Sequence, residues 1–302
     1  MRALRQAQRW LGAISVPGAI MDIKTVGVIG AGTMGNGIAH VFAKCGYPVL
    51  LVDVEQRFLD RGLDTIKKNL EREVSKQKIT VESRDATIAR IAPTTDRACL
   101  ATCDFVVEAA SERFEIKSEL FHDLDRLCRP EVILASNTSS ISITKLAAVT
   151  KRPEKVIGMH FFNPVPVMKL VEVIRGLATS DETYATVKGL AEKLEKTPVE
   201  VNDAPGFVSN RVLMPLLNEA MYTVMEGVAT PGAVDEVFKL GMAHPMGPLT
   251  LADFIGLDVC LDIMRVMQAG LGDPKYAPCP LLIKMVDAGW LGRKSGRGFY
   301  QY

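Results

Sequence analysis

The sequence predicts an α/β protein, with a Rossmann-type, doubly wound and mostly parallel sheet followed by an all-α C-terminal domain. From Lys24 to about residue 202, short apolar runs alternate with segments whose apolar residues recur at helical spacing. This alternation is typical of a parallel sheet with crossover helices. Beyond it only helical patterns follow, and 302 residues suffice for two domains. We expect an N-terminal extension over 1–21, a sheet domain over 22–202 and a helical domain over 203–302.

Composition and charge exclude several classes of protein. The 36 basic and 35 acidic residues give no global field for a nucleic-acid or membrane partner. No apolar run reaches the ~20 residues that a membrane span needs. The six cysteines are scattered, without metal-ligand spacing, so we expect no metal site and a reducing compartment. Cytoplasmic location is the prediction.

The first 21 residues leave a second location open. They contain Arg2, Arg5 and Arg9 but no acidic residue before Asp22. This pattern fits either a loose extension ahead of the first strand or an organellar presequence. The second alternative would place the protein in the mitochondrial matrix.

The first predicted strands and helices come in alternating order. "TVGVIG" (25–30) and "PVLLVDV" (48–54) are strand-like and enclose a helix-compatible segment. One long amphipathic helix follows, with apolar residues at Leu59, Leu63, Ile66, Leu70 and Val74. "CDFVVEAA" (103–110) and "VILASN" (132–137) are the next strands. The helix between them has one apolar face, formed by Ile116, Leu120, Leu124 and Leu127.

A glycine motif opens the first predicted helix, with Gly30, Gly32 and Gly35 in the pattern GxGxxG around Thr33 and Met34. In this pattern the glycines allow a tight turn, close approach of a pyrophosphate and close helix packing. Asp53 ends the second strand, 18 residues beyond Gly35, where a ribose-binding acid is expected. A carboxylate there would repel a 2′-phosphate by roughly 4 kcal/mol at ~4 Å. The motif predicts NAD rather than NADP, and the alternative is a plain glycine turn.

The apolar stretch "VIGMHFFNPVPVMKLVEVI" (156–174) contains two ionisable residues, His160 and Glu172. A hairpin centred on Pro166 would place them directly opposite each other, which would satisfy both when buried. Glu172 would then orient His160 as a general base. The alternative is a structural ion pair.

Other polar residues are weaker candidates. Asn137, Ser139 and Ser140 follow a strand and should border the crevice, although Ser140 or Ser142 would equally serve as a helix N-cap. Asn210 lies about one turn into the first helix of the second domain, where it either points into the interdomain cleft or merely caps the helix and meets solvent. We expect the remaining histidines to be structural. His40 and His122 lie in predicted helices as packing or surface residues, and His244 lies in a turn.

Taken in order, several motifs resemble those of the short-chain L-3-hydroxyacyl-CoA dehydrogenases, from about Lys24 to Tyr302. They are "GVIGAGTMGNGIA", "VVEAASERFEIK", "SNTSS", "GMHFFNPVPVMKLVEVI", "DAPGFVSNRV", "HPMGPLTLADFIGLDV" and "GRKSGRGFY". The resemblance implies oxidation of an L-3-hydroxyacyl-CoA by NAD to the 3-ketoacyl-CoA. It also implies a homodimer formed through the C-terminal domain.

The resemblance also implies roles for individual residues. His160 corresponds to the general base, Glu172 to the carboxylate that orients it, and Ser139 and Asn210 to groups that hold the substrate oxygens. The implied cofactor contacts beyond the glycine motif are Asp53, Glu112, Lys117 and Asn137. Asn163 and Lys68 are further substrate contacts, with the lysine near the CoA phosphates or simply on a solvated face.

Two rival functions are open at this point. One is an NAD-binding structural protein like lambda-crystallin, and the other is a dehydrogenase of a free hydroxy acid. An intact set of His160, Glu172, Ser139 and Asn210 argues against the first. The second would predict activity without CoA.

Overall fold

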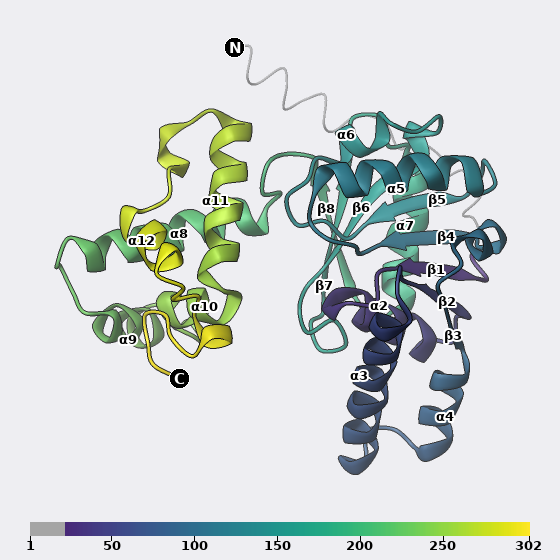
Figure 1. Ribbon diagram of the computed structural model, residues 1–302, viewed down its shortest axis with the longest axis horizontal. Helices are drawn as coiled ribbons and strands as arrows, with labels where there is room; N and C mark the ends of the chain where they lie inside the picture. The colour runs from purple at the N-terminus through teal and green to yellow at the C-terminus, as the bar shows by residue number, and fades with distance from the viewer. Residues whose placement is uncertain (1–21) are drawn as a thin grey trace.

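The computed structural model describes residues 22–302, so the expected extension over 1–21, with its two alternatives, lies outside the described residues. The described chain forms a sheet domain and a helical domain, and its C-terminus lies on the helical domain (Figure 1). The chain passes from one to the other between the last strand, β8 (Thr197–Asn202), and α8 (Ser209–Met225).

One sheet of eight strands forms the first domain in the described chain, in the order β3-β2-β1-β4-β5-β6-β7-β8. Neighbouring strands run parallel except β6 and β7, which are antiparallel. The strand order reverses at β1, which lies between β2 and β4, and open α/β sheets bind ligands at the carboxyl ends of the strands at such a point. The other strands are β1 (Val26–Ile29), β2 (Val49–Val52), β3 (Ile91–Thr94), β4 (Phe105–Glu108), β5 (Ile133–Ser136), β6 (Val156–Phe161) and β7 (Leu170–Arg175).

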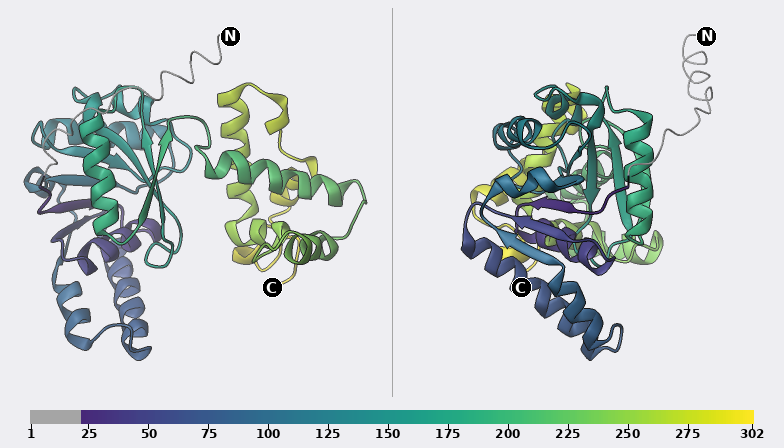
Figure 2. Two further views of the ribbon diagram at one scale, coloured as in Figure 1. Left: turned by 180° about the vertical axis from the view of Figure 1, so that it is seen from behind. Right: turned by 90° about the vertical axis from the view of Figure 1, so that its right-hand side faces the viewer.

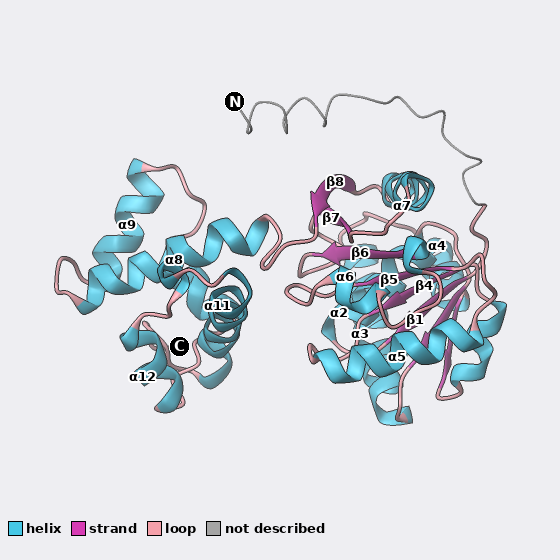
Figure 3. Cartoon of the chain, turned by 90° about the horizontal axis from the view of Figure 1, so that it is seen from above, coloured by secondary structure: helices cyan, strands magenta, loops and turns pink. Residues whose placement is uncertain are grey.

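Helices cover both faces of this sheet (Figures 2 and 3). On one face α2 (Thr33–Lys44), α7 (Asp181–Lys193) and part of α3 (Gln56–Ser75) enclose a core that includes Phe42 and Phe105. On the other, α5 (Phe114–Leu127), α6 (Ile143–Ala147) and the short helix η2 (Arg97–Thr102) enclose a second core. Burial of each large apolar side chain contributes roughly 1.5–3 kcal/mol to the stability of the folded domain. The predicted doubly wound sheet is confirmed.

The helix α3 projects from the sheet beside α4 (Val81–Ala89), as Figure 1 shows. It buries Leu59, Ile66 and Leu70 as its apolar periodicity predicts. The sequence reading missed α4 and the edge strand β3 that follows it. The four residues of β3 include Pro93 and show no β-rich run, and proline is tolerated in sheets mainly at such an edge.

The second domain packs helices around its own apolar core, which includes Met214, Leu249 and Met264. Among the described residues after Asn202 only isolated β-bridges accompany the helices, as expected. None of the described helices combines the length and apolarity that crossing a membrane would require. The helices after α8 are α9 (Pro231–Gly241), α10 (Pro248–Ile255), α11 (Leu257–Leu271) and α12 (Pro280–Asp287).

Candidate active site

The glycine motif forms the turn between β1 and α2. Gly30 has φ of 94°, which favours glycine, and a Cβ on Gly35 would overlap the Gly30 carbonyl oxygen. Gly32 is the N-cap residue of α2 and faces open space, so a ligand has access to its backbone. Thr33 and Met34 are the first residues of the helix. The unpaired N–H groups and the positive dipole end of α2 therefore offer a site for a pyrophosphate.

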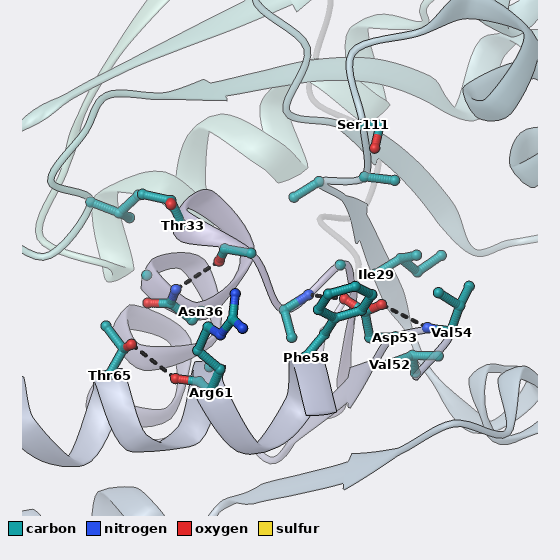
Figure 4. Close-up of a pocket in the computed structure, with 18 of the residues that line it drawn as sticks. Ile29, Thr33, Asn36, Val52, Asp53, Val54, Phe58, Arg61, Thr65 and Ser111 are labelled. Carbon is teal, nitrogen blue, oxygen red and sulfur yellow. Dashed lines mark hydrogen bonds between the residues drawn. The ribbon is translucent and has the colours of Figure 1, made fainter. Parts of the chain in front are cut away.

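Beside this turn lies a pocket of about 960 Å³, shown in Figure 4. Its wall includes Asp53, which directly follows β2 and accepts hydrogen bonds from the amides of Ala31 (2.6 Å) and Val54 (2.7 Å). These bonds fix the carboxylate at the carboxyl end of the sheet, where the sequence placed it. The same wall contains Asn163 from the turn after β6. Lys68 lies exposed on α3, one turn beyond the pocket-lining Thr65.

His160 and Glu172 are directly opposite each other across β6 and β7, as the hairpin prediction placed them. Nδ1 of His160 lies 2.8 Å from Oε2 of Glu172, and both residues are buried. Burial acts to raise the pKa of Glu172, but hydrogen bonds from His160 and Ser209 outweigh it and hold that pKa below its usual value. The carboxylate is thus ionised at neutral pH. It fixes Nδ1–H as the donor and leaves Nε2 as the acceptor.

The turn after β5 is held against β6 and against α8. Oδ1 of Asn137 accepts from the amide of Phe161 at 2.8 Å, and Nδ2 of Asn210 donates to the carbonyl of Ser139 at 3.1 Å. Asn210 is the second residue of α8, so it lies closer to the start of the helix than the predicted position about one turn in. Ser142, rather than Ser140, caps α6 by accepting from the amide of Lys145.

Glu112 and Lys117 meet beneath the same turn. Oε1 of Glu112 accepts from the amides of Ser139 (2.9 Å) and Ser140 (3.1 Å) and from Oγ1 of Thr138 (2.5 Å). Desolvation acts to raise the pKa of Glu112, but the charge of Lys117 and these hydrogen bonds lower it below its usual value. Nζ of Lys117 lies 3.4 Å from Oε2 of Glu112.

Sequence reasoning missed Glu108, the last residue of β4. It is fully buried, and its Oε1 accepts from Nζ of Lys117 and from the amide of Ala110, both at 2.6 Å. Its Oε2 accepts from Oγ of Ser136 at 2.6 Å. The signal was present, because "FVVEAA" sets a carboxylate in an apolar run in the same way that "LVEVI" sets Glu172.

Two family models match consecutive parts of the chain. The model of the 3-hydroxyacyl-CoA dehydrogenase NAD binding domain matches residues 25–204, and that of the C-terminal domain of the same family matches residues 206–302. The chain belongs to the 3-hydroxyacyl-CoA dehydrogenase family. The predicted enzyme class and the predicted cofactor, NAD, are thereby confirmed.

Individual members of the family are similar over nearly the whole chain. A probable 3-hydroxybutyryl-CoA dehydrogenase of Bacillus subtilis is 60% identical, over 93% of this chain and 98% of the relative. A 3-hydroxybutyryl-CoA dehydrogenase of Bradyrhizobium diazoefficiens is 55% identical, over 93% and 96%. The crystal structure of (S)-3-hydroxybutyryl-CoA dehydrogenase PaaH1 from Ralstonia eutropha superposes with a TM-score of 0.91, at 50% identity and over 93% and 99%.

The other histidines of this dehydrogenase lie elsewhere. His40 is fully buried in α2, and burial lowers its pKa to about 4, so it stays neutral near pH 7. His122 is exposed on α5, and His244 is exposed beside the ring of Phe238. These placements agree with the packing and surface roles that were expected.

Proposed function

We propose that this dehydrogenase interconverts (S)-3-hydroxybutyryl-CoA and acetoacetyl-CoA with NAD, with His160 as the general base. The observation that carries the proposal is the His160–Glu172 pair, which lies at the carboxyl end of β6. The dinucleotide pocket lies at the same end of the sheet, and the turn after β6 contributes to its wall. The short acyl chain is inferred from the relatives, whose names specify 3-hydroxybutyryl-CoA.

NAD held in the pocket would supply the acceptor for the hydride that leaves C3 of the substrate. Nε2 of His160 takes the proton of the 3-hydroxyl group, and Glu172 stabilises the resulting imidazolium. Ser139 and Asn210 hold the substrate oxygens, a role supported by the bond that keeps their segments together. In the reverse direction His160 returns the proton to the alkoxide.

The proposed cofactor contacts are those the sequence indicated. The motif residues Gly30, Gly32, Thr33, Met34 and Gly35 would receive the pyrophosphate, and Asp53 the ribose hydroxyls of the adenosine. Glu112 and Asn137 would border the nicotinamide end. Lys117 is buried, so we propose that it acts there by holding Glu112. Asn163 and Lys68 are the remaining substrate contacts, with Lys68 directed to the CoA phosphates.

The test is to mix the enzyme with acetoacetyl-CoA and NADH and to follow NADH absorbance. We expect rapid oxidation of NADH, and much slower oxidation when free acetoacetate replaces the thioester. Absence of oxidation above background would favour the structural, lambda-crystallin-like rival. Equal efficiency with free acetoacetate would favour the hydroxy-acid rival.

We also propose domains over 22–202 and 203–302, a cytoplasmic location and a homodimer formed through the second domain. The location is supported by the six cysteines, all of which are free thiols. The dimer is supported by exposed apolar side chains on the second domain. On α9 and just after it, Val237, Leu240 and Met242 are 57–78% exposed.

The dimer makes a separate prediction. We expect the enzyme to sediment at about twice its chain mass of 33.0 kDa. Leu240→Glu should shift the species toward the monomer at low protein concentration, because it buries a charge in the interface. Sedimentation velocity measures both, and a monomeric wild-type protein at micromolar concentration would contradict the proposal.

A further inference from the structure

Ser209, the first residue of α8, contacts the catalytic carboxylate twice. Its amide donates to Oε1 of Glu172 at 2.9 Å, and its Oγ lies 3.0 Å from Oε2. An ionised carboxylate only accepts hydrogen bonds, so the hydroxyl must be the donor. Oε2 is also the oxygen that meets Nδ1 of His160 at 2.8 Å. Two donors from different domains therefore share one acceptor atom.

The position of Ser209 follows from how α8 begins. The N-cap residue Val208 makes no side-chain cap, so the amide of Ser209, the first of this 17-residue helix, needs a partner from elsewhere. Glu172, from the sheet domain, supplies it. A negative charge at a helix N-terminus is stabilised by the dipole, and the Ser209 hydroxyl adds a second, shorter-range stabilisation of the same charge.

We propose that Ser209 is a positioning residue that sets the proton affinity of His160 through Glu172. By stabilising the charge of Glu172 whether or not His160 is protonated, the hydroxyl weakens the attraction between the carboxylate and the imidazolium. Without the hydroxyl, the carboxylate of Glu172 would attract the imidazolium more strongly, which would favour the protonated form of His160. This inference rests on the proposed role of His160 as the base.

Several charged groups on the surrounding elements are engaged with other partners. Glu112 binds the turn that contains Ser139, and Asp203, before α8, accepts from Ser142 and Thr144. On β8, Glu200 pairs with Arg175 of β7. On α8 itself, Arg211 is exposed to solvent. The rings nearest to His160 are the uncharged Phe162 and Phe207, at 4.6 and 6.2 Å between centroids.

The experiment compares the pH dependence of kcat/KM for oxidation of (S)-3-hydroxybutyryl-CoA by the wild-type enzyme and Ser209→Ala. Oxidation needs neutral His160, so activity falls at acidic pH. In Ser209→Ala we expect this acidic limb to move to higher pH by about half a unit to one unit, which is only part of the effect of a hydrogen bond to a charge because the hydroxyl acts on His160 through Glu172. The plateau at high pH and the KM for NAD should change little. A solely structural role would lower the plateau or the stability without moving the limb.

Two further variants complete the test. Ser209→Thr keeps a hydroxyl and should retain the wild-type profile. Thr223→Val removes a hydroxyl from the same helix, one that bonds to the carbonyl of Glu219, and should also leave the profile unmoved. Profiles of Ser209→Ala and the wild type that coincide would overturn the proposal, and so would an equal shift in Thr223→Val. An inactive wild-type enzyme would instead overturn the proposed function.

Discussion

Replacement of His160 by Gln is expected to lower kcat for reduction of acetoacetyl-CoA by roughly 10²–10⁴-fold, the usual contribution of a general acid–base. Glutamine keeps a polar side chain of similar reach but cannot exchange a proton near neutral pH. The affinity for NADH should change less than about threefold, a loss below 1 kcal/mol, because the pocket wall is built from the glycine turn and Asp53. Steady-state kinetics and fluorescence titration of NADH measure the two quantities separately.

Glu172→Gln is the matched comparison. It removes the charge that stabilises the imidazolium in the proposed mechanism but keeps an amide oxygen for Nδ1–H, so kcat should fall less than in His160→Gln. A larger loss in Glu172→Gln would contradict the division of roles. Near-normal turnover in His160→Gln would contradict the assignment of the base itself. Circular dichroism of both variants controls for unfolding, since each change leaves a buried polar group with a new partner.

Periodicity predicted the elements whose burial is one-sided or complete. The long α3 was found because Leu59, Ile66 and Leu70 recur at helical spacing and all pack on the sheet domain. The same method missed β3, since an edge strand of "IAPT" has two exposed residues and owes its place to pairing with β2. Such a strand is specified by tertiary contact, which local sequence does not carry.

The site divides in the same way. His160 and Glu172 were paired from sequence because they lie in one hairpin, where turn position alone fixes which residues face each other. Glu108 and Lys117 were not paired, because they lie on β4 and α5. The local sequence does not specify how the loop between this strand and this helix orients one against the other. Ser209 was missed for a further reason. The start of α8 was placed too early, so Ser209 was not seen as the residue whose amide and hydroxyl reach Glu172.

Lys117→Met is expected to lower the free energy of unfolding by about 3–5 kcal/mol, the cost of removing one partner of a buried ion pair. Glu108 is 0% exposed and Lys117 is 1% exposed, so no water replaces the lost ammonium group. Methionine fills a similar volume, which separates the loss of charge from the formation of a cavity. Urea denaturation at neutral pH measures the effect. Lys188→Met, which breaks an exposed pair with Glu192 on α7, is the control and should cost less than about 1 kcal/mol.

The pH dependence of this variant gives an independent check. In the wild type, the depressed pKa of Glu112 contributes stability above the pKa of the unfolded carboxyl group, and this stability is lost as pH falls through the folded pKa. The charge of Lys117 is the strongest of the influences that lower this pKa, so Lys117→Met has less stability to lose on acidification. The difference in unfolding free energy between the wild type and Lys117→Met should therefore become smaller from neutral to mildly acidic pH. Adding Glu108→Gln to Lys117→Met should restore at least half of the lost free energy at neutral pH. Two results would contradict a stabilising role for the buried pair of Glu108 and Lys117. One is a loss of unfolding free energy in Lys117→Met no larger than that in Lys188→Met, and the other is a loss that grows on acidification.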